Sequence, residues 1–250
     1  MSISERLYIQ WVRIIPFPQP TELIYALVPN LHQLPDDASE PTSTIVLTTP
    51  NRRFVDLRFL NPPSSPAESA PTQPPFPTLE WGTAGYSAGT PTHGTWTHDL
   101  SSRPTHPDGE TDVGTTEPHP SLPDVEIERG RMAHLDTGEV RAYEEAWRAV
   151  PVLPDESGKR IAVLLEMHRD DGDLTRRGTV VRVGQYCQGI VRDGGDISVQ
   201  RWLWTAGAWA NVGQVGGFDI PYDATWAVVQ EGDTVERSGA VWDVKEVAVL

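Results

Sequence analysis

Cysteine, lysine and long apolar runs are scarce in this sequence. Its single cysteine, Cys187, excludes an intramolecular disulfide, so the fold is not disulfide-stapled and secretion gains no support. No stretch approaches the roughly 18 apolar residues of a membrane-spanning helix. The first residues also lack the apolar middle and the cleavage site of a signal peptide. We therefore expect an intracellular protein of the cytoplasm without membrane insertion, and entry into the nucleus stays open.

Basic residues are few compared with acidic ones. The 250 residues include 35 acidic and 20 basic side chains, which gives a formal net charge of −15. The imbalance holds on both sides of Val150, with 20 acidic against 10 basic residues before the break and 15 against 10 after it. An acidic surface lacks the attraction that drives binding to phosphate backbones or anionic membranes. We therefore expect no nucleic-acid partner.

Alternation of apolar and polar residues is the dominant pattern, and it predicts β-strands. From Arg52 to Leu60 the alternation has a period of two, which is typical of a half-buried strand. The apolar face of this strand holds Val55, Leu57 and Phe59, and the polar face holds Asp56 and Arg58. A similar strand carries Trp242 and Val244 on one face. It follows a hairpin turn at Ser238-Gly239.

Glycine-containing turns separate other strand-like runs, and helical signal is rare. The turns are predicted at Asp136-Thr137-Gly138, Asp171-Gly172 and Asp193-Gly194-Gly195. The run from Arg141 to Val150 fits helical spacing, but Tyr143 and Trp147 also share one strand face. A hairpin turn leads directly into this run, so we favour a strand.

Proline marks the boundaries of the predicted organisation. Residues 61–77 hold seven prolines in seventeen positions, which excludes a paired central strand and indicates a long exposed insertion. A second stretch, Ser101 to Pro123, reads as irregular. Residues 151–159 combine prolines, a glycine and charges, as domain linkers do. The sequence thus predicts an all-β chain of two consecutive antiparallel β-barrel domains, residues 1–150 and 160–250.

Four segments together resemble the fungal Hri family, which is named for an interaction with a casein-kinase-I-type kinase. They are LEWGTAGYSAG (Leu79 to Gly89), IERGRMAHLDTGEVRAYEEAWR (Ile127 to Arg148), VVRVGQYCQGIV (Val180 to Val191) and RSGAVWDVKEV (Arg237 to Val247). The resemblance extends from about Ile45 to the end of the chain. It implies two consecutive lipocalin-like β-barrel domains, a binding protein of cytoplasm and nucleus, and no established enzymatic activity.

Aromatic side chains provide the candidate ligand-binding residues. Trp96 and His98 share one strand face, and Trp202 and Trp204 share another. Inward-facing aromatic residues of a small barrel either fill the core or line a ligand cavity, and core filling is the interpretation we favour. If the barrels do enclose cavities, we expect the following residues to line them: Trp81, Tyr86, Trp96, His98, Tyr186, Trp202 and Trp204.

The sequence contains only weak matches to catalytic and metal-binding motifs. Ser87 lies in a G-x-S-x-G pattern at Gly85–Gly89, but the Thr, Pro and Gly residues that follow do not open the helix a hydrolase needs. We interpret the segment as a bent, glycine-rich strand. The acidic turn Asp170–Asp173 lacks the glutamate that ends a calcium-binding loop, and Cys187 is expected to be a buried apolar residue.

Four histidines between residues 93 and 119 could suggest a metal site. His93 and His98 are five positions apart, so they face opposite sides of one regular strand. His106 and His119 lie in proline-flanked stretches, where we expect solvated side chains. We therefore predict no metal, no cofactor and no catalytic residue.

Two functions remain open at this stage, with a third that is weaker. The first is a non-enzymatic adaptor of the Hri family that engages a partner such as a casein-kinase-I-type kinase. The second is a barrel that binds, isomerises or cyclises a small hydrophobic metabolite. The third is a serine hydrolase at Ser87, which requires a helix after Gly89.

Overall fold

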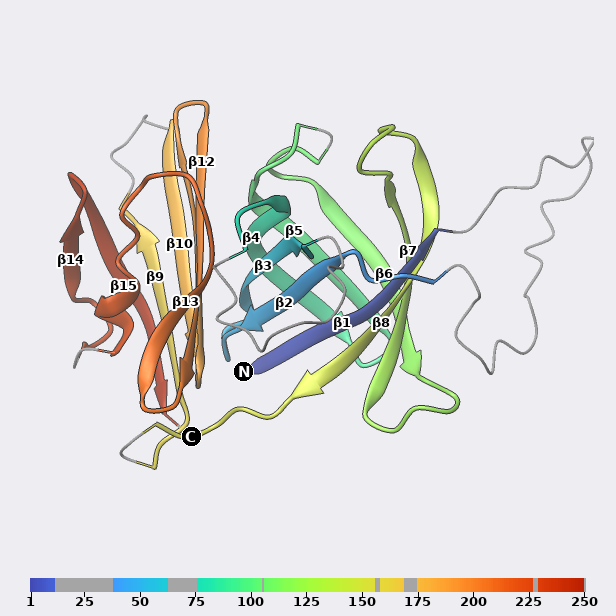
Figure 1. Ribbon diagram of the computed structural model, residues 1–250, viewed down its shortest axis with the longest axis horizontal. Coiled ribbons are helices and arrows are strands. Elements are labelled where there is room, and N and C mark those ends of the chain that lie inside the picture. Colours follow the sequence, from blue (N-terminus) through green and yellow to red (C-terminus); the bar gives the residue numbers. More distant parts are fainter. Residues whose placement is uncertain are drawn as a thin grey trace, which may run out of the picture.

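The computed structural model describes residues 1–11, 38–62, 76–104, 106–155, 158–168, 175–226 and 229–249. These residues form antiparallel β-strands and one short 3-10 helix, η1 (Tyr222–Trp226), as Figure 1 shows. The all-β prediction is therefore confirmed. Most of the proline-rich stretch (residues 63–75) and the acidic turn at residues 170–173 lie outside the described residues.

The first eight strands close into a barrel, because β1 pairs antiparallel with both β2 and β8. The strands are β1 (Ser2–Trp11), β2 (Thr42–Thr48), β3 (Arg53–Leu60), β4 (Leu79–Thr90), β5 (His93–Ser101), β6 (Thr111–Pro118), β7 (Val125–Ala133) and β8 (Val140–Val150). The ambiguous run from Arg141 is a strand, as its preceding turn indicated. The stretch from Ser101 to Pro123, predicted to be irregular, contains β6, so that expectation was wrong.

The second half forms an open sheet of seven strands, in the order β13-β12-β11-β10-β9-β15-β14. The strands are β9 (Ile161–Met167), β10 (Arg176–Val183), β11 (Tyr186–Asp193), β12 (Asp196–Thr205), β13 (Ala208–Val215), β14 (Thr234–Arg237) and β15 (Ala240–Val249). A second closed barrel is thus not confirmed. The connection from β13 to β14 contains η1, and its Phe218 and Ile220 pack on the sheet as a cover.

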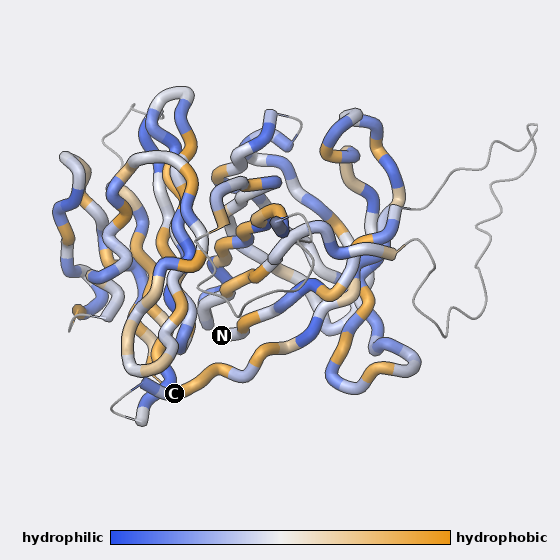
Figure 2. Tube along the Cα trace, viewed as in Figure 1, coloured by the Kyte–Doolittle hydropathy of each residue, from blue (hydrophilic) through white to orange (hydrophobic). Residues whose placement is uncertain are grey.

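One face of the open sheet packs directly on the barrel wall. Val181, Ile190 and Val199 of the sheet share a single hydrophobic core with Leu57 and other residues of the barrel. Figure 2 shows hydrophobic segments on both sides of this boundary. The opposite face of the sheet holds a second core beneath the connection that carries η1. The two halves are therefore joined by a continuous apolar layer.

Two polar side chains of the sheet cross this apolar layer. Arg201 Nε donates a hydrogen bond of 2.6 Å to Gln188 Oε1. Gln188 Nε2 donates in turn to the backbone carbonyls of Ile45 and Val55 in the barrel, at 3.0 Å each. Arg201 also donates to the carbonyl oxygens of Ser43 and Leu57. Buried backbone carbonyls of β2 and β3 thus receive hydrogen bonds from the sheet.

Strand β3 shows how this packing orients the barrel. Val55, Leu57 and Phe59 are fully buried against the open sheet, on the outer surface of the barrel. Asp56 and Arg58 point the other way, into the barrel, and are also buried. The alternation was predicted correctly, but the strand is buried on both faces rather than on one. The barrel interior is consequently polar.

Candidate functional site

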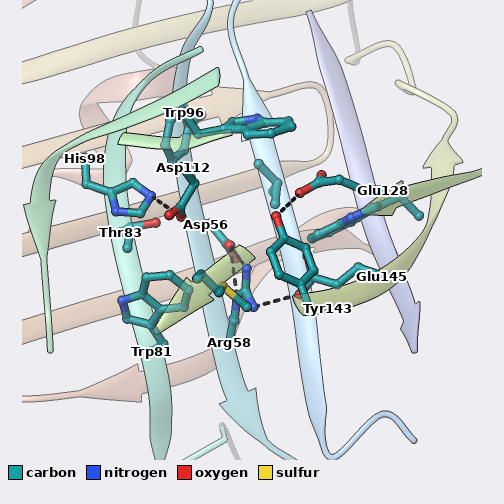
Figure 3. Close-up of a pocket in the computed structure, with 14 residues that line it drawn as sticks. Asp56, Arg58, Trp81, Thr83, Trp96, His98, Asp112, Glu128, Tyr143 and Glu145 are labelled. Carbon is teal, nitrogen blue, oxygen red and sulfur yellow. Dashed lines mark hydrogen bonds and ion pairs between the residues drawn. The ribbon is translucent and has the colours of Figure 1, made fainter. Parts of the chain in front are cut away.

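A cavity of about 60 Å³ lies inside the closed barrel, and we take it as the candidate functional site (Figure 3). Its walls combine charged, hydroxyl and aromatic side chains from six strands, β2 to β5, β7 and β8, with one further residue from β6. The lining residues are Val46, Phe54, Asp56, Arg58, Trp81, Thr83, Trp96, His98, Asp112, Glu128, Met132, Tyr143, Glu145 and Trp147.

Two arginines form a buried ion-pair network at one end of the cavity. Arg58 donates to Asp56 Oδ2 at 2.9 Å and to Glu145 Oε1 at 3.0 Å. Arg6 donates to the same Glu145 oxygen at 2.6 Å and to Glu40 at 2.7 Å. Burial disfavours the charged form of Glu145, but the two guanidinium groups outweigh it and lower the pKa of that carboxyl. Each guanidinium is thus paired with carboxylates of the chain itself.

Glu128 of β7 presents a carboxyl group on another wall. The Tyr143 hydroxyl donates to its Oε1 at 2.7 Å. Burial, reinforced by the negative charge of Glu145, raises the pKa of Glu128 to about 8. Near neutral pH this side chain therefore carries a proton for most of the time.

Asp112 of β6 and His98 of β5 meet at the side of the cavity. His98 Nε2 lies 3.4 Å from Asp112 Oδ2. Burial lowers the pKa of His98 to about 4, and the nearby His106 and Arg58 act in the same direction. Burial and the charge of Glu110 raise the pKa of Asp112 to about 6. The imidazole is therefore neutral near pH 7, and the contact does not supply a counter-charge to Asp112.

Three buried polar atoms of the cavity walls have no hydrogen-bond partner among the described residues. They are Asp56 Oδ1, His98 Nδ1 and Trp147 Nε1. Buried polar atoms are nearly always hydrogen-bonded, because leaving one unpaired costs roughly 1–3 kcal/mol. Their presence around one cavity indicates a site that a polar molecule or ordered water completes.

The cavity continues toward one end of the barrel. A second, more open hollow of about 520 Å³ shares the lining residues Val46, Trp96, Glu128 and Trp147 with it. Residues from the ends of β1 and β2, such as Ser2 and Thr48, complete this hollow. The shared residues make up the boundary between an inner chamber and a wider mouth.

The structure separates the aromatic residues predicted to line barrel interiors. Trp81, Trp96 and His98 line the cavity. Tyr86 is 44% exposed, and Tyr186 packs at the boundary between barrel and sheet. Trp202 stacks on Tyr222 with ring centroids 3.7 Å apart, and Trp204 lines a hollow of about 360 Å³ at the open sheet.

The charged residues of the cavity were missed by the sequence analysis. Asp56 and Arg58 were assigned to the polar face of a half-buried strand, and Glu128, Tyr143 and Glu145 were not proposed as site residues. The available signal was the placement of opposite charges two positions apart on β3, which lets Arg58 bond Asp56 within one strand face. Their burial depends on the sheet that covers the opposite face.

The histidines and Ser87 can now be placed. His93 is exposed, but His106 and His119 are buried, so their interpretation as solvated loop residues was wrong. His106 Nε2 lies 2.8 Å from the Ala133 carbonyl oxygen. The His106 ring packs on the Trp81 ring, with the two ring centroids 4.4 Å apart. Within the described ranges, no group of three or more metal-ligating side chains converges. Ser87 lies in strand β4, and a turn into β5 follows Thr90 in place of a helix.

Comparison with known proteins gives one family and one solved fold. The family model described as "Protein HRI1" matches residues 2–246. The crystal structure of the uncharacterized protein YLR301w from Saccharomyces cerevisiae aligns with a TM-score of 0.67 and 17% identity, over 99% of this chain and 98% of that one. At that identity the likeness shows the fold alone. No curated protein matches the chain. In the part of the chain that the structure describes, no helix is long and apolar enough to cross a membrane.

Proposed function

The chain belongs to the HRI1 family, and from this premise we propose that it is a binding protein whose closed barrel holds a small polar molecule. The observation that carries the proposal is the set of unpartnered polar atoms around the inner cavity, Asp56 Oδ1, His98 Nδ1 and Trp147 Nε1. A polar ligand would supply the missing hydrogen bonds. The charged lining supports a polar ligand over the hydrophobic metabolite that the aromatic pattern suggested.

The route to the cavity defines a test. Val46 lies on the boundary between chamber and mouth, so Val46→Phe places a bulky ring across the passage. Val113 is 58% exposed on β6, and Val113→Phe is the matched control. A ligand that binds only the folded state raises the melting temperature, and the stabilisation grows with the logarithm of its concentration above Kd. We expect some members of a panel of small cationic, neutral and anionic compounds to stabilise the wild type and V113F, but not V46F.

Two results would count against this proposal. If the panel stabilises neither the wild type nor V113F, the cavity is not a ligand site. If V46F folds and responds to the same compounds as the wild type, the ligand binds elsewhere on the chain.

A second candidate function is that of an adaptor for a protein partner, for which we propose a casein-kinase-I-type kinase in the cytoplasm and nucleus. The support is the resemblance of the sequence to the Hri family and the net charge of −15, which favours approach to a basic protein surface. Titration of the full chain into a purified kinase of this type tests the idea. We expect binding that weakens as salt is raised, and absence of binding at low salt would overturn it.

A further inference from the structure

We propose that the inner chamber of the barrel binds a primary ammonium group carried on a slim aliphatic chain. The inference rests on the proposed function, because it names the chemical class of the ligand for the same cavity. Three independent features carry it: the distribution of charge, the kind of unpartnered atom and the size of the chamber.

The distribution of charge leaves two carboxyl groups without a cation. Arg6 and Arg58 are each held by carboxylates at the network end of the cavity. Glu128 takes its hydrogen bond from the neutral Tyr143 hydroxyl, and Asp112 faces the imidazole of His98. In the described residues, neither carboxyl group forms an ion pair with an arginine or a lysine. A cation between them would pair with carboxyl groups that the chain leaves without one.

Two of the three unpartnered atoms of the chamber are hydrogen-bond acceptors. His98 is 3% exposed, and its Nε2 faces the Asp112 carboxylate, which places the imidazole proton on that nitrogen. Its Nδ1 then carries a free lone pair. Asp56 is 7% exposed, and its Oδ1 is a second free acceptor. An ammonium group has three donors and no acceptor, so it matches these two atoms, whereas a carboxylate ligand would set its own lone pairs and charge against them.

Figure 3 shows how these groups lie. Trp96, Asp112, Glu128 and Tyr143 surround one space, with His98 beside Asp112. Trp96 and Trp147 also belong to the wall shared with the mouth. Indole faces attract cations, so the same wall that admits the ligand favours a positively charged group. The remaining unpartnered atom, Trp147 Nε1, is a donor on this wall and is not matched by the ammonium group itself.

The size of the chamber selects among cations. About 60 Å³ corresponds to roughly two water molecules, since each occupies about 30 Å³ in the liquid. An ammonium nitrogen with its first methylene group fits that space. A tetramethylammonium ion, with four methyl groups around nitrogen, does not. The rest of an unbranched chain would extend past Val46 into the mouth of about 520 Å³.

The test is a titration of the full chain with matched probes at neutral pH. Binding is measured by tryptophan fluorescence and by calorimetry. The probes are n-butylamine, n-butanol, n-butyrate and tetramethylammonium. We expect saturable binding of one n-butylamine per chain, with no saturation by the other three. Glu128→Gln keeps an oxygen for the Tyr143 hydroxyl but cannot give up a proton to form a carboxylate when the ammonium group binds, and should weaken n-butylamine binding by about tenfold or more. Glu139→Gln, at an exposed ion pair with Arg141, should leave it unchanged.

The outcomes separate this inference from the proposal on which it rests. If n-butanol or n-butyrate binds in the chamber and n-butylamine does not, the ammonium assignment is wrong while the barrel remains a ligand site. If neither these probes nor the broader panel bind, the ammonium assignment and the proposed binding function are both wrong. Should E128Q not fold, Asp112→Asn provides the second variant. Binding of n-butylamine with wild-type affinity to the folded variant would overturn the inference.

Discussion

Tyr143 and Glu128 lie on neighbouring strands of the barrel, and the tyrosine hydroxyl donates a hydrogen bond of 2.7 Å to the glutamate Oε1. Gly130 permits this contact, since a Cβ atom there would lie 2.6 Å from the Tyr143 oxygen. The pair places a mostly protonated carboxyl group on the cavity wall. Its titration should therefore be visible in the stability of the whole chain.

Glu128 makes stability fall as the pH rises. Its pKa is raised from 4.5 to about 8 on folding, so the folded state holds the proton more tightly than the unfolded state. The resulting stabilisation is fully present below the unfolded pKa and is lost as the pH rises through the folded one. Glu128→Gln, which cannot ionise, should flatten this decline. Urea unfolding of both proteins at several values between about pH 5 and pH 9 checks it. If the free energy of unfolding depends on pH in the same way in both proteins, folding does not raise the pKa of Glu128.

Glu145 is the shared partner of two buried guanidinium groups. It accepts from Arg6 and from Arg58 while only 2% exposed. Removing one member of a buried ion-pair network leaves the others uncompensated, which costs about 3–5 kcal/mol. We expect Glu145→Gln to lower the free energy of unfolding by an amount in that range. Glu139→Gln breaks an exposed pair and should leave the free energy of unfolding nearly unchanged, because water screens the interaction. Equal losses in the two variants would mean that the network is not a stabilising element.

Local patterns predicted most strands of this fold but not the polarity of the barrel interior. Alternation placed Val55 and Leu57 on the face of β3 opposite Asp56 and Arg58. It did not say which face a second sheet would cover, because that sheet begins about one hundred residues later in the chain, at Ile161. Side-chain period alone does not distinguish inside from outside when both faces are buried.

The predictions of a second closed barrel and of solvated histidines were wrong for a similar reason. The strand count after residue 160 depends on the connection from β13 to β14, which covers the sheet through Phe218 and Ile220 instead of adding a closing strand. His106 was assigned to solvent from its flanking prolines, yet it packs on Trp81, which is 25 positions away. The cavity likewise brings together β3, β5, β6, β7 and β8, and only barrel closure sets those distances.

Cys187 offers a direct measure of global unfolding. It is the single cysteine of the chain, fully buried, and burial raises its pKa to about 12. The thiolate is the reactive form, so labelling by a thiol reagent at neutral pH requires the core around η1 to open. We expect the labelling rate to match the rate of unfolding, with urea increasing both in parallel. Rapid labelling of the native protein would show that the cover over this face of the sheet opens locally.

Gly213 tests the contact between the barrel and the open sheet. A Cβ atom at this position of β13 would lie 2.8 Å from the ring of Phe59, which is fully buried in the shared core. Gly213→Ala should therefore force the ring or the strand to shift. Overpacking of this kind typically costs about 1–3 kcal/mol. The control is Gly195→Ala, because a Cβ atom there meets open space and the backbone does not have a positive φ.

Chemical denaturation of both alanine variants measures the difference. G195A should unfold within about 0.5 kcal/mol of the wild type, while G213A should unfold at lower denaturant in one cooperative transition. A single transition is expected because Phe59 belongs to the core that joins the barrel to the sheet, so loosening this contact destabilises both. If G213A instead unfolds in two steps, the two halves are stable separately, and the shared core does not couple them.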